Sequence, residues 1–260
     1  QTDLYLIIGL VFLSLVASAT QDIATDTLAV LSFDKRDKSL VNSMQSMGSF
    51  GGTLIGTGVL LLVLQHYGWH AVIPCLCIFV LLAVMPLRKN KRMRMTVKES
   101  AKRARLTDFI WFFARRSIWK QIGFLLLYYA SIIGILSVLR SYLVDLDYSM
   151  KEIGIMIGIV GTGAAFASSF LAGLLVRKIG RYYSRILFAI FILFTTLYFM
   201  CISWTPPSLP MLCLGIVLLW SAYGMATIVV YTTAMDCVRK GCEGTDFTIQ
   251  TVLTHLSGLL

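Results

Sequence analysis

The stretch LYLIIGLVFLSLVASATQDIATDTLAVL, residues Leu4–Leu31, decides the fold class of this 260-residue chain. It is longer than the roughly 20 apolar residues that a helix needs to cross about 30 Å of hydrocarbon. Lipid offers no hydrogen bonds to a peptide backbone, so a spanning stretch must satisfy its own amides as an α-helix. The residues therefore predict a membrane-spanning helix.

Further apolar stretches follow along the chain. Those long enough to cross are Val41–Leu64, Ala71–Leu87, Ile118–Val144, Ile153–Val176, Ile186–Trp204 and Leu209–Val238. The last stretch, Phe247–Leu260, is too short to cross, and we expect it to be the truncated beginning of another span. The predicted fold class is all-α membrane, and we expect the chain to be a fragment of a longer polytopic protein.

The composition excludes several classes of protein. Hydrophobic residues make up 57% of the chain and charged residues 14%, and the mean hydropathy is +0.79. Soluble globular proteins carry about 25% charged residues, so that class is excluded. The net charge of +10 lies in short loops between spans, so we expect no nucleic-acid partner. Nucleophile, phosphate-loop and zinc motifs are lacking, so we predict no enzyme, no cofactor and no metal site.

Lysine and arginine residues fall almost entirely in alternate loops. They occupy the connections after the first, third, fifth and seventh spans, whereas the opposite loops hold only Lys151. Because cytoplasmic loops are enriched in Lys and Arg, the first span should run from outside to inside. We predict that residues 1–87 end an N-terminal bundle with three spans and that residues 88–117 form a basic cytoplasmic linker. Residues 118–260 should form a C-terminal bundle with four spans and a truncated fifth.

A polar stripe runs along the first span at three- and four-residue steps. Its members are Ser14, Ser18, Gln21, Asp22, Thr25 and Asp26. Carboxylates are costly to hold in lipid, so Asp22 and Asp26 should face a cavity or a partner. Together with Gln21 they are candidates for a substrate or proton pathway. Alternatively, a carboxylate such as Asp26 anchors the inner end of the helix by pairing with an arginine of a neighbouring loop.

Two other spans carry candidate pathway residues. Arg140 lies inside a predicted span and shares a helix face with Tyr129. Its guanidinium could clamp an anionic group, or it could extend to the nearby outer boundary of the membrane. The seventh span has an aromatic face, which predicts either a wall of the pathway or ordinary helix packing. The aromatic residues of this face are Trp220, Tyr223 and Tyr231.

Glycines at helical spacing mark the second and fifth spans. They are Gly48, Gly52 and Gly56 in the second span and Gly154, Gly158 and Gly161 in the fifth. Small residues at these intervals let helix backbones approach closely, so we predict that these faces pack against other helices. Smooth faces of this kind would also suit two bundles that slide past each other.

With these residues in view, the chain resembles the transporters of the major facilitator superfamily. The segment GLLVRKIGR, Gly173 to Arg181, is similar to that superfamily's loop signature between paired helices. Gly173, Lys178, Gly180 and Arg181 stand at the matching positions. Arg177 stands where the signature usually has an acidic residue, so we expect the charge relay ascribed to the signature to be altered or absent.

Other segments resemble one group within this superfamily. ATQDIATDTLAV, residues Ala19–Val30, is similar to the fourth helix of muropeptide and siderophore permeases, and acetyl-CoA carriers share a similar pattern. NSMQSMG at 42–48, LRSYLVDLDYS at 139–149 and GTDFTIQ at 244–250 look closer to the siderophore permeases. On this resemblance the spans correspond to helices four to eleven of twelve. The second and fifth spans would then face each other across the two bundles.

The resemblance implies a two-bundle secondary active transporter that works by alternating access. It implies proton-driven import of a siderophore or similar mid-sized polar solute across a bacterial inner membrane. Asp22 and Asp26 match paired aspartates of the group, and Arg140 matches a basic position in its seventh helix. The partners would be the lipid bilayer, the small-molecule substrate and protons. A muropeptide permease, or a non-transporting sensor or scaffold on a transporter fold, are the alternatives.

Overall fold

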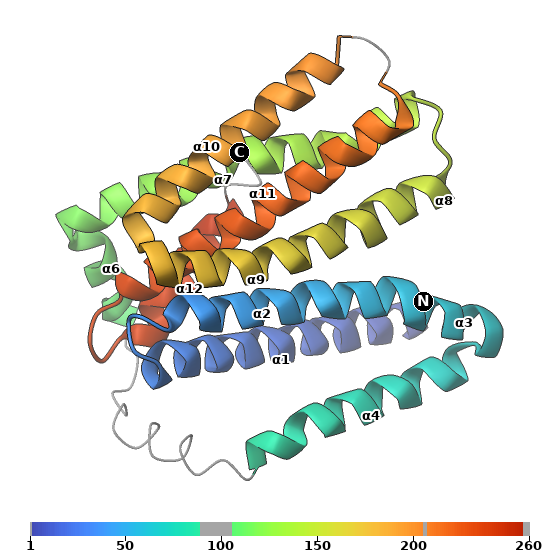
Figure 1. Ribbon diagram of the computed structural model, residues 1–260. Coiled ribbons are helices and arrows are strands. Elements are labelled where there is room, and N and C mark those ends of the chain that lie inside the picture. The colour runs from blue at the N-terminus through green and yellow to red at the C-terminus, as the bar shows by residue number, and fades with distance from the viewer. Residues whose placement is uncertain (1, 89–105, 205–206, 257–260) are drawn as a thin grey trace.

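The computed structural model describes residues 2–88, 106–204 and 207–256, and every regular element in these ranges is a helix (Figure 1). The predicted all-α class is confirmed. The elements are α1 Thr2–Ser32, α2 Lys38–Leu54, η1 Ile55–Leu60, α3 Leu61–Tyr67, α4 Trp69–Arg88, α6 Leu106–Ala114, α7 Arg116–Asp145, α8 Met150–Ile153, η2 Gly154–Gly161, α9 Thr162–Ile179, α10 Arg181–Ile202, α11 Leu209–Asp236 and α12 Glu243–Leu256. The segments η1 and η2 are π-helical, so α2–η1–α3 and α8–η2–α9 each form one continuous rod.

Six of the described helical segments are long and apolar enough to cross a membrane. They are Leu4–Ser32, Trp69–Pro86, Arg116–Asp145, Met150–Ile179, Arg181–Ile202 and Leu209–Asp236. Each overlaps a predicted span. The predicted span Val41–Leu64 lies within the α2–η1–α3 rod, and the last predicted stretch corresponds to α12, which begins earlier, at Glu243. Residues 89–105 of the predicted linker, and residues 257–260, lie outside the described residues.

The turns that carry basic residues gather at one end of the molecule, on the left in Figure 1. Arg181, after α9, donates a hydrogen bond to the carbonyl of Lys35, after α1. Lys38 Nζ, at the start of α2, lies 3.0 Å from the carbonyl oxygen of Met235, near the end of α11. We call this end of the molecule, where Lys35, Lys38 and Arg181 lie, the basic end. The α7–α8 turn, which precedes Lys151, lies at the opposite end.

Local sequence explains where several helices end. Gly180 separates α9 from α10 with a φ of 84°, and Gly68 separates α3 from α4 with a φ of 70°. These are conformations that glycine adopts without the steric cost that a Cβ would bring. At the start of α8, the Ser149 hydroxyl accepts from the Glu152 amide while the Glu152 carboxylate accepts from the Ser149 amide. This capping box satisfies two amides at the helix start.

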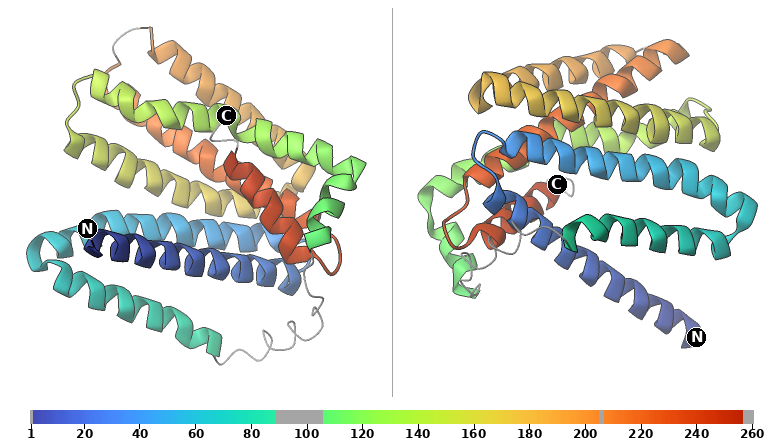
Figure 2. Two further views of the ribbon diagram at one scale, coloured as in Figure 1. Left: turned by 180° about the vertical axis from the view of Figure 1, so that it is seen from behind. Right: turned by 60° about the horizontal axis from the view of Figure 1, so that its bottom comes forward.

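The buried core lies in the C-terminal part, around α11. Leu212, Ile216 and Leu219 of α11 are fully buried, and they pack in one cluster with Leu125 and Ile132 of α7. By contrast, the apolar side chains of α1 and α4 are mostly exposed, and these two helices diverge from the rest (Figure 2). Apolar faces of this kind suit contact with lipid or with further apolar helices.

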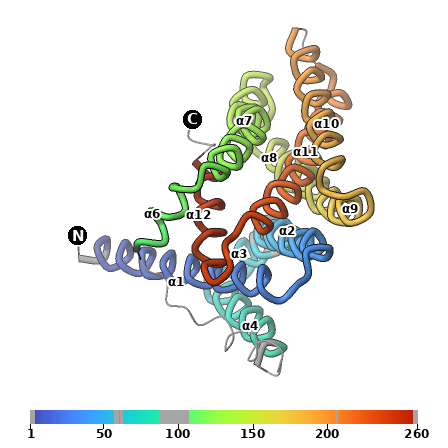
Figure 3. The backbone as a smooth tube through the Cα atoms, turned by 90° about the vertical axis from the view of Figure 1, so that its left-hand side faces the viewer, coloured from blue at the N-terminus to red at the C-terminus, as the bar shows by residue number. Residues whose placement is uncertain are grey.

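The two rods pack side by side, with α2 against α9, as the view from the basic end shows (Figure 3). This confirms the expected facing of the second and fifth spans. At the crossing, the Ser39 hydroxyl lies 3.2 Å from the Gly173 carbonyl oxygen. Farther along, the ring of Phe166 in α9 packs against Gly51 of α2.

The predicted glycine faces are not the ones that make this contact. A Cβ on Gly48, Gly52 or Gly56 would meet nothing within 4 Å, and the same holds for Gly154. Among the described residues, the serine flank of α2 meets α9 instead, so a packing role of these four glycines stays a prediction. In the other rod Gly161 does pack closely, against Trp220, while Gly158 is half-buried.

A buried ion pair joins the α11–α12 turn to α12 and α6. Asp246 is fully buried, and its Oδ2 lies 2.8 Å from Arg239 Nε. The same guanidinium donates to the Asp108 carbonyl oxygen of α6 at 2.8 Å. The hydrogen bond to Asp246 raises the pKa of Arg239 above its ordinary value. The Arg239–Asp246 pair therefore holds the short helix α6 against the α11–α12 turn.

We expect Asp246→Ala to destabilise the full-length protein by about 3–5 kcal/mol, because it leaves a partly buried guanidinium without its carboxylate. The matched control is Asp37→Ala. Asp37 and Arg177 form an ion pair in which both side chains are 41% exposed, so its loss should cost about 0–1 kcal/mol. Thermal unfolding in detergent measures both. Equal losses for the two variants would contradict this assignment.

Candidate functional site

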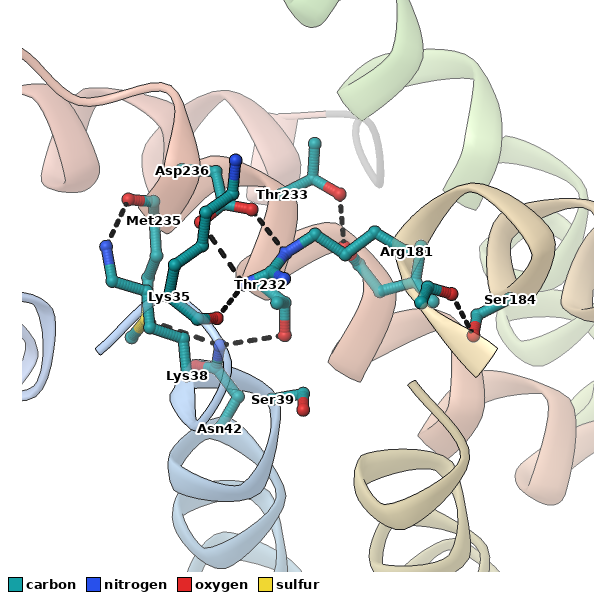
Figure 4. A network of polar contacts seen from close by, with 12 residues as sticks. Lys35, Lys38, Ser39, Asn42, Arg181, Ser184, Thr232, Thr233, Met235 and Asp236 are labelled. Atoms are coloured by element: carbon teal, nitrogen blue, oxygen red, sulfur yellow. Dashed lines mark hydrogen bonds and ion pairs between the residues drawn. The ribbon is translucent and has the colours of Figure 1, made fainter. Parts of the chain in front are cut away.

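A polar network closes the basic end between the N-terminal and C-terminal helices (Figure 4). Lys38 and Asn42 lie one turn apart on α2 and both reach α11. Asn42 Nδ2 lies 3.1 Å from the Thr232 hydroxyl and 3.3 Å from Met235 Sδ. Burial lowers the pKa of Lys38, and its ammonium donates to the Met235 carbonyl. The network therefore joins the start of α2 to the C-terminal end of α11.

Arg181 is the central cation of this network. Its guanidinium forms an ion pair with Asp236 at the end of α11 and donates to the Lys35 carbonyl, and both interactions are visible in Figure 4. The Arg181 and Asp236 side chains are only 19% and 12% exposed. A pair this sheltered is screened less by salt than a surface pair. One side chain of the predicted loop signature thus joins three turns.

The departure from the loop signature at Arg177 has a structural counterpart. Arg177 forms an ion pair with Asp37, in the turn before α2, with 3.1 Å between the two groups. The position that usually carries an acidic residue is here cationic, and its acidic partner comes from the N-terminal helices. Lys178 is exposed, and Gly180 supplies the turn between α9 and α10.

Gly173 sets the closest approach between the two rods. A Cβ on Gly173 would lie 2.4 Å from Ser43 Cβ and 3.1 Å from the Ser39 carbonyl oxygen. Distances this short leave no room for a side chain without a shift of one helix. Gly173, Ser39 and Ser43 are all buried, so the crossing is tight because every residue in it is small.

Just beyond the closed end lies an acidic patch. Asp26 of α1 is half-buried, and its Oδ1 accepts a hydrogen bond of 3.0 Å from Gln45 Nε2 of α2. Tyr231 of α11 lies within electrostatic range of Asp26. Within the described residues the partner of Asp26 is the Gln45 amide and not a loop arginine, while the arginines between residues 89 and 105 lie outside the described part of the chain. Gln21 and Asp22, on the previous turn, are exposed.

An aromatic cluster continues from this patch along α11. The Tyr223 ring packs edge-on against three others, with centroid separations of 6.0 Å to Phe50, 5.9 Å to Tyr129 and 6.0 Å to Trp220. The Tyr129 hydroxyl donates to the Thr227 hydroxyl at 2.7 Å. Phe50 comes from α2, so the aromatic face predicted on α11 contacts both halves of the chain.

Arg140 lies apart from these residues. Tyr129 is buried and bonded to α11, whereas Arg140, three turns farther along α7, is exposed. The two residues point in nearly the same direction from α7, as predicted, but their surroundings differ. Eleven residues turn an α-helix by about three full turns plus 20°, but burial also depends on which helices flank each end. α11 covers α7 at Tyr129 and leaves Arg140 uncovered.

Comparison with known families agrees with this architecture. The family model described as Major Facilitator Superfamily matches residues 1–260. The chain belongs to the major facilitator superfamily. Members of this superfamily are transporters and not enzymes, so the chain belongs to a family of multi-pass membrane transporters. The segment Gly173–Arg181, which was predicted to be the superfamily's loop signature, supplies Gly173, Arg177 and Arg181 to the closed end.

Several residues of the closed end were not among the predicted site residues. They are Asp37, Lys38, Ser39, Asn42, Thr232 and Asp236. The sequence contained a signal for two of them. Asp236 ends an apolar span directly before a basic turn, and Asn42 begins the quoted NSMQSMG motif. Which carboxylate meets which cation depends on how the two halves are placed, which spacing along one helix does not specify.

We expect Gly173→Ala to separate the two rods at the basic end. The added methyl would overlap Ser43, so the closed arrangement would lose its tightest contact. Spin labels at Arg36 and Lys178, both exposed and in different halves, measure the change as a longer distance in the full-length protein. Gly52→Ala is the control, because its methyl meets nothing within 4 Å. An unchanged distance in the Gly173 variant would refute the role of this crossing.

Proposed function

We propose that the chain is the part of a proton-coupled importer that carries a siderophore or similar mid-sized polar solute across a bacterial inner membrane. The observation that carries this proposal is the half-buried Asp26 placed directly beyond a closed polar network between two helix groups. Membership of a transporter superfamily and the similarity of the ATQDIATDTLAV segment to siderophore permeases support it. The proposed pathway comprises Gln21, Asp22, Asp26, Tyr223 and Tyr231.

In this proposal the basic end is the inner gate of an alternating-access cycle. Opening it would break the Arg181–Asp236 pair, the Lys38 bond to α11 and the Asn42–Thr232 bond. Hydrogen bonds contribute about 0.5–1.5 kcal/mol each, and those to charged groups about 1.5–3. The closed state is therefore favoured by a few kcal/mol, an amount that substrate and proton binding can overcome by differential affinity.

The acidic patch is the proposed coupling site. Asp22 acts electrostatically on Asp26, and neither carboxylate forms an ion pair with a lysine or arginine within the described part of the chain. A cation bound here, whether a proton or a cationic ligand, would offset the repulsion between two like charges. Coupling follows if protonation of Asp26 depends on which side of the membrane the patch faces.

The orientation of the chain is tested by single cysteines at Lys35 and Lys151 in an otherwise cysteine-free full-length protein. Because Lys35 lies at the basic end, it should react with an impermeant thiol reagent only from the cytoplasmic side. The cysteine at position 151 should react only from the outside. Labelling of both from one side would overturn the proposed orientation and the cytoplasmic placement of residues 88–117.

Import is tested by uptake of a radiolabelled iron–siderophore complex into cells that depend on the full-length protein. We expect Asp26→Asn and Asp22→Asn each to reduce uptake at least tenfold, because the removed carboxylates can no longer exchange a proton. Asp145→Asn is the control, since Asp145 is exposed at the end of α7. Normal uptake in both pathway variants would remove these carboxylates from the mechanism. Uptake of muropeptides in place of the iron complex would favour the alternative permease.

A further inference from the structure

We infer that α6 is a membrane-interface helix that docks on anionic phospholipid headgroups in the leaflet at the basic end. The inference goes beyond the proposed function and does not depend on the substrate or on proton coupling. It comes from three features that meet where α6 joins α7. These are the direction of α6, its exposed apolar side chains and the positive charge beside them.

The first feature is the direction of α6. One residue, Arg115, separates α6 from α7, and its backbone is extended, with φ −77° and ψ 117°. The chain therefore bends at Arg115, and α6 runs across the basic end and not along α7, as Figures 1 and 2 show from opposite sides. α7 is long and apolar enough to cross a membrane. A helix that runs across the end of such a span lies at the level of the lipid headgroups.

The second feature is the apolar surface that α6 exposes. Thr107 and Asp108 are its polar residues, so little of its circumference suits contact with water. Ile110 and Trp111 are 70% and 65% exposed, and Trp119, near the start of α7, is 59% exposed. Tryptophan is enriched at membrane–water interfaces because its ring is apolar and its N–H group is polar. Contact with lipid at this level would stabilise these side chains.

The third feature is the positive charge beside this apolar surface. Arg115 and Arg116 form the corner, Lys120 follows one turn later in α7, and all three are exposed. Each basic residue near an anionic leaflet strengthens binding about fivefold. An anionic phospholipid has both an apolar chain region and a negative headgroup. It therefore complements the exposed rings and the basic corner at the same time.

A buried anchor fixes which side chains of α6 face outward. Phe112 lies about 200° around the helix from Ile110 and is fully buried. It packs in one cluster with Ile122 of α7 and Ile249 of α12. The Arg239 guanidinium, which donates to a carbonyl oxygen of α6, adds a second attachment. With one side of α6 held against the C-terminal helices, Ile110 is directed away from them.

The placement of α6 is tested with the fluorophore NBD on single cysteines in the otherwise cysteine-free full-length protein. The protein is reconstituted in nanodiscs of phosphatidylcholine and phosphatidylglycerol in equal parts. At Ile110→Cys, spin-labelled lipid should quench the fluorescence strongly and aqueous iodide weakly. At Arg36→Cys, in the exposed turn after α1, iodide should be the stronger quencher. Stronger quenching by iodide at position 110 would refute the inference, and so would shielding from both quenchers, which would show that protein covers α6.

The preference for anionic lipid is measured with the same label at position 110. Spin-labelled phosphatidylglycerol should quench more effectively than spin-labelled phosphatidylcholine. Arg115→Gln combined with Arg116→Gln should lower this preference about fivefold for each charge removed, whereas Arg115→Lys with Arg116→Lys should keep it.

The matched control is Arg36→Gln combined with Lys178→Gln, which removes the same charge from exposed positions at the basic end outside α6. This control should leave the preference at position 110 unchanged. Equal quenching by the two lipids in the unaltered protein would refute the inference. An equal loss of preference in the control and in the Arg115–Arg116 variant would also refute it, because the charge of the corner would then have no special role.

Discussion

The close crossing of α2 and α9 at Gly173 is the constraint on which the rest of the described structure depends. Because Gly173, Ser39 and Ser43 are all small, the two helix axes come near enough for the polar side chains around them to meet. Lys38 and Asn42 can then reach α11, and Arg181 can reach both Lys35 and Asp236. A larger residue at the crossing would separate these groups, and each would be left partly desolvated without a partner.

The fold class and the grouping of the turns could be predicted from the sequence because both follow from the membrane itself. Apolar length decides which segments cross, and the distribution of Lys and Arg decides which turns share a side. These rules need no knowledge of how one helix meets another. They therefore predicted that turns as distant in the chain as those of Lys35 and Arg181 would lie on the same side.

The pairing of helix faces could not be read in the same way. The family resemblance correctly paired the two rods that meet, yet the flank of α2 that makes the contact carries serines, and Gly48, Gly52 and Gly56 lie elsewhere. Likewise, regular spacing placed Arg140 with Tyr129, whereas α11 covers one of these residues and not the other. Periodicity indicates that a helix has a distinct face, but the position of its neighbours determines what that face contacts.

The π-helical segment η2 has a consequence for how the α8–η2–α9 rod is interpreted. A π-turn accommodates about one more residue than an α-turn, so the side chains on either side of Gly154–Gly161 are rotated relative to an unbroken helix. If positions on one face are counted in steps of 3.6 residues from Lys151 toward Gly173, the count no longer matches the true face of the rod beyond η2. Any comparison of this rod with a uniformly α-helical relative must shift its register at η2, or residues on opposite flanks will be treated as equivalent.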